Sequence, residues 1–299
     1  MSGDLANEPW RVRALRAIIR AVPRGRYAAL AHLPLDSGRF EARLAADAGG
    51  ASFACDLADQ IAREACLTGL YEPPVTRVFQ QQLRPAGVAI DVGANWGYFT
   101  LVAAAAVGPR GRVIALEPDP RQYHALMRNV AANGFAHVDV RHAAASATSG
   151  RVTLSGYGET DTNRGVSTIA GAAAGSGPRF DVDATTIDEL TRDGRSVDVI
   201  KIDVEGAEDL VLQGMRTGLE EHRYRAVLLE LHPQALRARG VSAEQCIGLL
   251  ESHGYRGSTI DASAAAYRRA LDPATSAASL LGPVEAWHAS SWPHLLWLC

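Results

Sequence analysis

The stretch VAIDVGANWGYFT, residues 88–100, decides how this chain folds. It begins as an apolar run typical of a buried strand, and that run contains Asp91 near its end. A glycine turn follows with the spacing Gly-x-Asn-x-Gly, formed by Gly93, Asn95 and Gly97, and then an apolar stretch with the composition of a buried helix. Strand, glycine turn and helix in this order are typical of the first unit of a nucleotide-binding sheet.

Further strand-like and helix-like stretches alternate along the rest of the chain. The strand-like runs lie at residues 111–118, 138–146, 197–206, 225–233 and 294–299, and the helix-like ones at 120–134, 207–222 and 242–255. Strands that are apolar throughout and separated by helices are buried on both faces, as in parallel sheets. We therefore expect an α/β fold with a mostly parallel sheet and helices on both faces.

The chain divides into two predicted parts around residue 85. Residues 1–84 are expected to form an N-terminal helical segment that covers the substrate mouth as a lid, with one helix that Pro73 and Pro74 end. Residues 85–299 form the sheet domain, which a glycine- and serine-rich, hairpin-like insertion interrupts at about residues 151–185. Within this insertion, the sequence AGAAAGSG (170–177) predicts a mobile stretch.

Composition and charge narrow the choice of partners. The net charge of -3 gives no electrostatic reason to expect nucleic acid. No run of roughly 18 apolar residues is present to cross a membrane. An amphipathic basic run at residues 11–26 favours a helix with a solvated face, with membrane or RNA contact as the alternative. We expect a small-molecule substrate, no nucleic-acid or membrane partner, and either a monomer or a homodimer.

The N-terminus and the cysteines bear on the compartment. The first residues include acids and a tryptophan where a secretory signal would need an apolar core, which argues against export. The four cysteines (Cys55, Cys66, Cys246 and Cys299) are scattered and are expected to be reduced thiols in a cytoplasm. Abundant alanine, arginine and glycine with few lysines favour a GC-rich bacterial gene.

The glycine turn departs from the pattern that binds a dinucleotide. A G-x-G-x-x-G turn lets the backbone approach a pyrophosphate, whereas here Asn95 occupies the middle position and Asp91 would repel a phosphate. An acid beside a glycine turn suits the cationic ammonium group of S-adenosylmethionine. Glu117, at the end of the next strand, is placed to hold both ribose hydroxyls. The alternative is that the glycines only make a tight turn and Glu117 only caps the following helix.

Ionisable residues gather at the ends of the fourth and fifth predicted strands. IKIDVEGAE places Asp203 at one strand end, with Glu205 and Glu208 after it, and LLELHP places Glu230 and His232 at the neighbouring end. We predict Asp203, His232 and Glu230 as catalytic candidates for removing a proton from the acceptor. Glu208 is read as a helix N-terminal acid. The open alternative is a hard ion such as Mg²⁺ on Asp203, Glu205 and Glu230.

With these residues set out, the sequence resembles the FkbM family of S-adenosylmethionine-dependent methyltransferases over roughly residues 53–255. The resemblance rests on GLYEPPV, AIDVGANWGYFTLVAA, ALEPDP, LMRNVAANG, DVIKIDVEGAEDLVLQG and LLELHP, of which KIDVEGAE is the most specific. It implies a Rossmann-like class I methyltransferase fold with an antiparallel last strand. It also implies methyl transfer to a hydroxyl of a sugar or small natural product. The cofactor-binding residues are then expected to be Asp91, Gly93, Asn95, Gly97, Glu117, Pro118 and Asp203.

Three other functions stay open at this point. An NAD-linked oxidoreductase is disfavoured by the missing middle glycine, and an N-methyltransferase of a peptide or small amine would use the same cofactor site. A binding module that has lost its chemistry is disfavoured by the intact KIDVEGAE and LELHP motifs.

Overall fold

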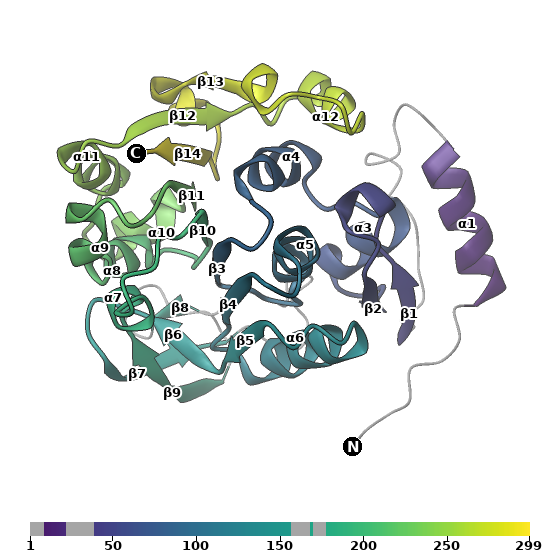
Figure 1. Ribbon diagram of the computed structural model, residues 1–299, viewed down its shortest axis with the longest axis horizontal. Coiled ribbons are helices and arrows are strands. Elements are labelled where there is room, and N and C mark those ends of the chain that lie inside the picture. Colours follow the sequence, from purple (N-terminus) through teal and green to yellow (C-terminus); the bar gives the residue numbers. More distant parts are fainter. Residues whose placement is uncertain (1–8, 22–38, 157–167, 170–177) are drawn as a thin grey trace.

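The computed structural model describes residues 9–21, 39–156, 168–169 and 178–299 (Figure 1). The stretch at residues 88–100 forms β3 (Val88–Val92), a turn, and the start of α5 (Tyr98–Val107), as predicted. β3 lies inside a sheet, between β4 (Arg112–Leu116) and β10 (Val199–Ile202), and is parallel to both. The chain order reverses at β3, so the turn after this strand opens at the switch point where α/β sheets bind their ligands.

The main sheet has eight strands in the order β13-β12-β14-β11-β10-β3-β4-β5. Its remaining members are β5 (Val138–Arg141), β11 (Ala226–Glu230), β12 (Arg256–Ile260), β13 (Leu281–Pro283) and β14 (His294–Leu298). The five neighbouring strands β11, β10, β3, β4 and β5 run parallel to one another. β14 is antiparallel to both β11 and β12. The predicted α/β fold with a mostly parallel sheet and an antiparallel last strand is confirmed.

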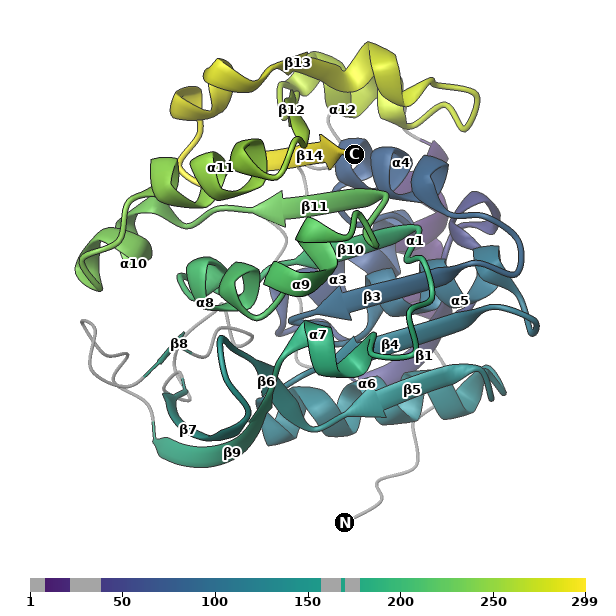
Figure 2. The same ribbon diagram turned by 60° about the vertical axis from the view of Figure 1, so that its left-hand side comes forward.

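Helices cover both faces of this sheet (Figure 2). One face packs against α4 (Pro73–Gln82), α5, α6 (Pro120–Ala132) and α12 (Ala264–Ala270), and the other against α8 (Glu208–Gln213), α9 (Arg216–Glu220), α10 (Pro233–Ala238) and α11 (Ala243–Ser252). Successive strand residues alternate between the two cores: Ala89 belongs to the first and Ile90 to the second. No described helix has both the length and the apolar character needed to cross a bilayer.

The N-terminal part differs from the predicted helical segment. It contains α1 (Trp10–Ala21) and α3 (Gln60–Thr68), but also an antiparallel hairpin of β1 (Arg39–Arg43) and β2 (Ser52–Asp56). The prediction that Pro73 and Pro74 end a helix was wrong. α3 ends before Gly69, and the two prolines begin α4, where a missing N–H costs nothing because the first helical positions have no intrahelical acceptor.

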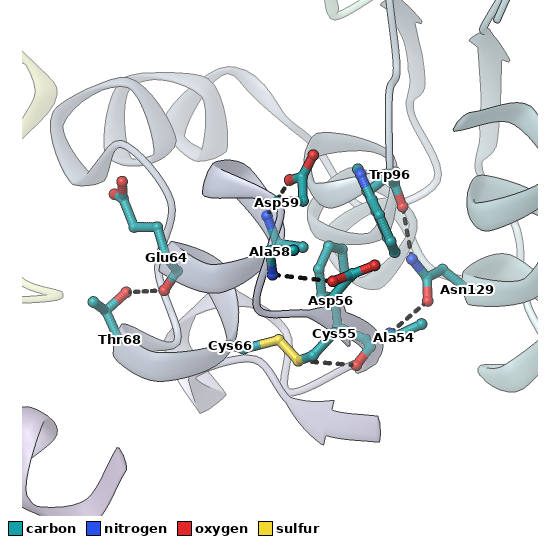
Figure 3. Close-up of a disulfide and its surroundings, with 12 residues drawn as sticks. Ala54, Cys55, Asp56, Ala58, Asp59, Glu64, Cys66, Thr68, Trp96 and Asn129 are labelled. Atoms are coloured by element: carbon teal, nitrogen blue, oxygen red, sulfur yellow. Dashed lines mark hydrogen bonds between the residues drawn. A yellow bond between two sulfur atoms is a disulfide. The ribbon is translucent and has the colours of Figure 1, made fainter. Parts of the chain in front are cut away.

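Two cysteines correct the expectation of four reduced thiols. Cys55 in β2 and Cys66 in α3 form a disulfide, with their Cα atoms 6.0 Å apart (Figure 3). The hairpin folds back against α3 and brings the two residues within bonding range, which their separation in the sequence does not reveal. Cys246 is buried and free, and Cys299 is exposed and free, as expected.

The insertion forms a small second sheet. β7 (Gly150–Ser155) pairs antiparallel with β9 (Arg179–Thr185), and the sheet order is β6-β9-β7-β8, where β8 is Thr168–Ile169. The third predicted strand, residues 138–146, is divided between β5 in the main sheet and β6 (Ala143–Ala145) in the small one. His142 lies at this division, with its ring stacked on Tyr123. The predicted mobile stretch at 170–177 lies outside the described residues.

Two further differences concern the C-terminal half. The predicted helix at 207–222 consists of α8 and α9, separated near Gly214, where a Cβ atom would lie 2.1 Å from the Ser146 carbonyl oxygen. A side chain at position 214 would therefore clash with the backbone that follows β6. β12, α12 and β13 were not predicted, because the sequence RGSTI of β12 lacks the apolar run of the central strands.

Candidate active site

A cavity of about 290 Å³ opens beyond the carboxyl ends of β3, β4, β10 and β11. Four parts of the chain line it: the strand ends, the small sheet through Val152 and Leu154, the N-terminal part through Gln60 and Glu72, and the segment before β14 through Trp292. The cavity brings together all the predicted cofactor-binding residues except Gly97, and two of the three predicted catalytic residues, Asp203 and Glu230. His232 is not among the described residues that line it.

The turn after β3 is shaped by its glycines. Gly93 has a φ of +79°, and a Cβ atom there would lie 1.8 Å from the Asp203 carbonyl oxygen. Gly97 has a φ of +87°, and a Cβ atom there would lie 2.5 Å from Leu126. Gly93 therefore lets the ends of β3 and β10 approach each other, while Gly97 lets α5 pack against α6. Gly97 acts in packing, which leaves its predicted cofactor contact untested.

Asn95 and Glu117 form one hydrogen-bonded unit beside the turn. The Asn95 backbone N–H donates to Glu117 Oε2 at 2.7 Å, and the Asp119 N–H donates to Glu117 Oε1 at 2.8 Å. Each carboxylate oxygen can still accept from a second donor. Burial, opposed by these hydrogen bonds, raises the pKa of Glu117 to about 8. The carboxylate is thus fixed at the cavity wall with free lone pairs, which fits a ribose diol.

Asp91 offers a buried acceptor to the cavity. Its Oδ2 accepts from the Thr100 hydroxyl at 2.6 Å, and its Oδ1 is buried without a hydrogen-bond partner. Burial raises the pKa of Asp91, and the nearby Lys201 opposes that shift. An unsatisfied buried carboxylate oxygen is costly unless a donor reaches it. The ammonium group of S-adenosylmethionine is such a donor, so the residues at this end fit that cofactor.

Lys201 and Asp203 form a pair at the end of β10. The Lys201 Nζ donates to Asp203 Oδ2 at 2.8 Å and lies 4.6 Å from the centre of the Phe99 ring. Lys201 is the only lysine in the sequence, and its side chain is 2% exposed. Burial works to raise the pKa of Asp203, but Lys201, with His232 and His294, holds it below its usual range. Asp203 is therefore ionised at neutral pH.

His232 lies behind the cavity wall, among carboxylates. Its Nδ1 is 2.7 Å from Glu208 Oε1 and its Nε2 is 3.2 Å from Glu205 Oε2. Burial lowers the pKa of His232, but Glu208, Glu205 and Glu230 outweigh it and raise the value to about 10. His232 lies between two carboxylates and not among the described residues that line the cavity, so its role as a base stays a prediction. The geometry favours a role in holding Glu205 and Glu208.

Glu208 and Glu205 differ from their sequence-based descriptions. Glu208 is fully buried and accepts from the Gly206 N–H as well as from His232, so it is more than a helix N-terminal acid. Glu205 has a φ of +52° and lines the cavity, and burial raises its pKa to about 8. Its partner His232 is 27 positions further along the chain, in a different strand unit, which is why spacing alone did not indicate the contact.

Sequence reasoning missed further residues at the site. Tyr71 and Trp292 line the cavity, and His294 contacts Glu230 and Glu72 behind it. Tyr71 and Glu72 belong to the GLYEPPV motif, so a signal for them existed. His294 and Trp292 became candidates only through the position of β14 beside β11.

The ionisable side chains that line the cavity are mostly acidic, although burial raises the pKa of two of them, Glu117 and Glu205, to about 8. The described residues that line it include six carboxylates (Glu72, Asp91, Glu117, Asp203, Glu205 and Glu230) and one cationic side chain, Lys201. Such a lining attracts a sulfonium or ammonium group and repels a pyrophosphate. The electrostatics therefore favour S-adenosylmethionine over NAD.

Comparisons with known proteins show which proteins this chain is similar to. A family model described as the methyltransferase FkbM domain matches residues 91–256. Methyltransferase sdnD from Sordaria araneosa is 29% identical over 198 residues, which cover 56% of this chain and 72% of that protein. Precorrin-6y C5,15-methyltransferase from Geobacter metallireducens is 12% identical over 77% of this chain and 89% of its own, with a TM-score of 0.40. Fibrillarin from Aeropyrum pernix, solved with natively bound S-adenosylmethionine, is 15% identical over 79% of this chain and 73% of its own, with a TM-score of 0.38.

Proposed function

The chain belongs to the FkbM methyltransferase family, and we propose that this S-adenosylmethionine-dependent methyltransferase acts on a hydroxyl group of a sugar or another small natural product. Membership in a methyltransferase family removes the NAD-linked oxidoreductase as an alternative. It also leaves the nature of the acceptor as the main question.

One observation supports the proposal above the others: a single cavity joins the cofactor end to a carboxylate wall. Gly93, Asp91 and Glu117, placed for the cofactor, line it together with Asp203 and Glu230. Methyl transfer to oxygen needs the acceptor held in line with the sulfonium methyl group and its proton removed as the bond forms. A carboxylate wall beside the methyl donor supplies groups for both tasks.

We assign proton removal to Asp203, with Glu230 as the second candidate. S-adenosylmethionine supplies an electrophilic methyl group when bound. Asp203 is ionised and lines the cavity. Its Oδ2 accepts a hydrogen bond from Lys201, which fixes the orientation of the carboxylate. His232 positions Glu205 and Glu208, and its positive charge offsets part of their negative charge. In this assignment the N-terminal part, through Glu72 and Tyr71, closes the acceptor end as a lid.

A Mg²⁺ ion on Asp203, Glu205 and Glu230 is the alternative way to activate the hydroxyl. Two of these carboxylates already have cationic partners, because Lys201 contacts Asp203 and His232 contacts Glu205. A hard ion would have to compete with both. We therefore favour the mechanism in which Asp203 acts directly.

The acidic lining also favours a second candidate function, N-methylation of an amine. An ammonium group would be drawn into a cavity with six carboxylates and one lysine. It would then have to lose a proton before attack, so the same Asp203 would act on nitrogen in place of oxygen.

The test is a methyl-transfer screen with matched acceptors. Glycosides and polyketide alcohols are compared with their amino-substituted counterparts, and product mass and NMR identify the methylated atom. We expect methylated hydroxyls, and turnover that falls at least about 10²-fold in Asp203→Asn with nearly unchanged affinity for S-adenosylhomocysteine. Products methylated only on nitrogen would favour the second candidate. Unchanged turnover in Asp203→Asn would remove the assigned base.

A further inference from the structure

Glu72, Glu230 and His294 converge at the acceptor end of the cavity from three separate elements. Glu72 precedes α4, Glu230 ends β11, and His294 begins β14. The His294 Nε2 lies 2.9 Å from Glu230 Oε2 and 3.3 Å from Glu72 Oε2. One ligand atom from each residue lies within 4.8 Å of the others, which is the spacing of atoms that share a bound ion.

The His294 Nε2 is buried and lies at ion-pair distance from both carboxylates, but its N–H is aligned with neither of them. His294 is 9% exposed, and its Nε2 has no hydrogen-bond partner although two carboxylate oxygens lie close to it. The N–H direction therefore misses both oxygens, as it would if the nitrogen pointed at a position between them. A buried ring nitrogen whose N–H is aligned with no acceptor is costly, and a metal ion that replaced the ring proton would be shared by all three side chains.

Glu72 is held in its position by an unusual backbone conformation. Its φ of +42° and ψ of +66° place it in the left-handed region, directly before Pro73, where residues prefer extended conformations. Its N–H donates to the side chain of Glu64 at 3.2 Å. Such a conformation costs about 1–3 kcal/mol and persists only where surrounding structure fixes it. The result here is a carboxylate directed to the cavity.

We propose that Glu72, Glu230 and His294 bind a divalent transition-metal ion of the Zn²⁺ type at the acceptor end of the cavity. One imidazole with two carboxylates suits such an ion better than Mg²⁺, which prefers oxygen ligands alone. Three protein ligands would leave a coordination position open, and an ion held by them would be reached from the cavity, because Glu72 and Glu230 both line it. The ion binding itself does not rest on the proposed hydroxyl acceptor.

A neighbouring group, Asp203, Glu205 and His232, has a similar spacing but is less suited to bind an ion. Lys201 donates to Asp203, and both ring nitrogens of His232 face carboxylates, one of them in a hydrogen bond with Glu208. An ion there would displace existing partners. Glu205 consequently provides a matched control, because Glu205→Gln makes the same substitution of a glutamate that lines the same cavity outside the proposed site.

The test measures metal binding without any acceptor. Metal-free protein is titrated with Zn²⁺ by calorimetry and with Co²⁺ by visible absorption, in a Cys299→Ser background. This background is needed because His222 Nδ1 lies 2.7 Å from Cys299 Sγ, and that pair could bind Zn²⁺ itself. We expect one ion per chain with a dissociation constant in the micromolar range or below. Glu72→Gln and His294→Asn should each weaken binding at least about tenfold, and Glu205→Gln by less than about threefold.

Two results would overturn the site. One is the absence of binding by wild-type protein, and the other is binding that survives Glu72→Gln and His294→Asn but is lost in Glu205→Gln. Affinity for S-adenosylhomocysteine is measured on every variant to show that it is folded; Glu72→Gln, outside any strand, keeps the test usable if His294→Asn does not fold. Failure of the acceptor screen with intact Zn²⁺ binding would count against the proposed acceptor and not against this site.

Discussion

At the scale of single residues, Glu117 joins the glycine turn to the start of α6, and its predicted contact with the cofactor can be tested directly. Its two oxygens accept backbone N–H groups from Asn95 and Asp119 and can each accept once more. Glu117→Ala removes the ribose acceptors and loosens the turn. Because hydrogen bonds to a charged group contribute about 1.5–3 kcal/mol, S-adenosylhomocysteine should bind about 10–100-fold more weakly. Calorimetry checks this, with the exposed Glu220→Ala as control; equal affinity in both variants would contradict the role of Glu117.

His232 gives a second residue-scale prediction, on stability against pH. Its pKa is raised from about 6.5 to about 10 in the folded chain, chiefly by Glu208 and Glu205 against the effect of burial. A group whose pKa is raised in the folded chain stabilises the fold. This stabilisation is fully present below the pKa of the unfolded chain, and it is lost as the pH rises through about 10. The melting temperature of His232→Gln should therefore lie several degrees below wild type at pH 6.5, and the gap should shrink towards pH 9.5. A gap that is constant with pH, or one also seen in the exposed His124→Gln, would contradict this.

Residues of the site differed in how far the sequence could reveal them. Asp91, Glu117, Asp203 and Glu230 were predicted because each follows or ends an apolar strand, and parallel strand ends meet at one edge. The roles of Glu208 and His294 depend on partners in other elements. Glu208 contacts His232 across the β10–β11 boundary, and His294 reaches Glu230 only because β14 inserts beside β11. The local sequence pattern does not indicate contacts between residues of separate elements.

At the scale of elements, the predictable strands were those buried on both faces. β3, β10 and β11 appear in the sequence as continuous apolar runs. β1 has alternating exposed and buried residues, with Phe40 and Ala42 inward, a period-2 signal that was present but was read as helical. β12 lacked both signals. The helix predicted at 207–222 is interrupted near Gly214, where the Ser146 carbonyl oxygen leaves no room for a side chain.

The hairpin and α3 provide the element-scale prediction, because the Cys55–Cys66 disulfide joins them (Figure 3). A disulfide that closes a loop of this size stabilises by about 2–3 kcal/mol, chiefly by restricting the unfolded chain. Replacing both cysteines by alanine should lower the melting temperature by a few degrees. The exposed Cys299→Ser should not change it. Thermal unfolding with and without reductant checks the bond, and a wild-type melting temperature insensitive to reductant would show that the pair does not stabilise the fold.

At the scale of the whole molecule, the N-terminal part and the sheet share one hydrophobic core. Phe40 and Phe53 of the hairpin and Phe79 of α4 are buried in the same cluster as Leu101 of α5. Asn129 of α6 accepts from the Ala54 N–H at 2.7 Å and donates to the Trp96 carbonyl at 2.7 Å, which ties the hairpin to the glycine turn (Figure 3). A lid that could be removed would not share its packing in this way. Residues on the two sides of the predicted boundary at residue 84 therefore line different parts of the cavity, but we expect both parts to unfold together.

This shared core predicts a single cooperative unfolding transition. Phe53→Ala creates a cavity beneath the hairpin and should cost about 3–5 kcal/mol, close to the about 2–5 kcal/mol expected of Leu101→Ala under the sheet. In both variants the whole denaturant curve should shift to lower midpoint with an unchanged slope, because one unit unfolds. Tryptophan fluorescence and circular dichroism, followed in the same urea titration, should give coincident curves. If Phe53→Ala instead produced an early transition while the sheet unfolded at the wild-type midpoint, the N-terminal part would be an independent lid.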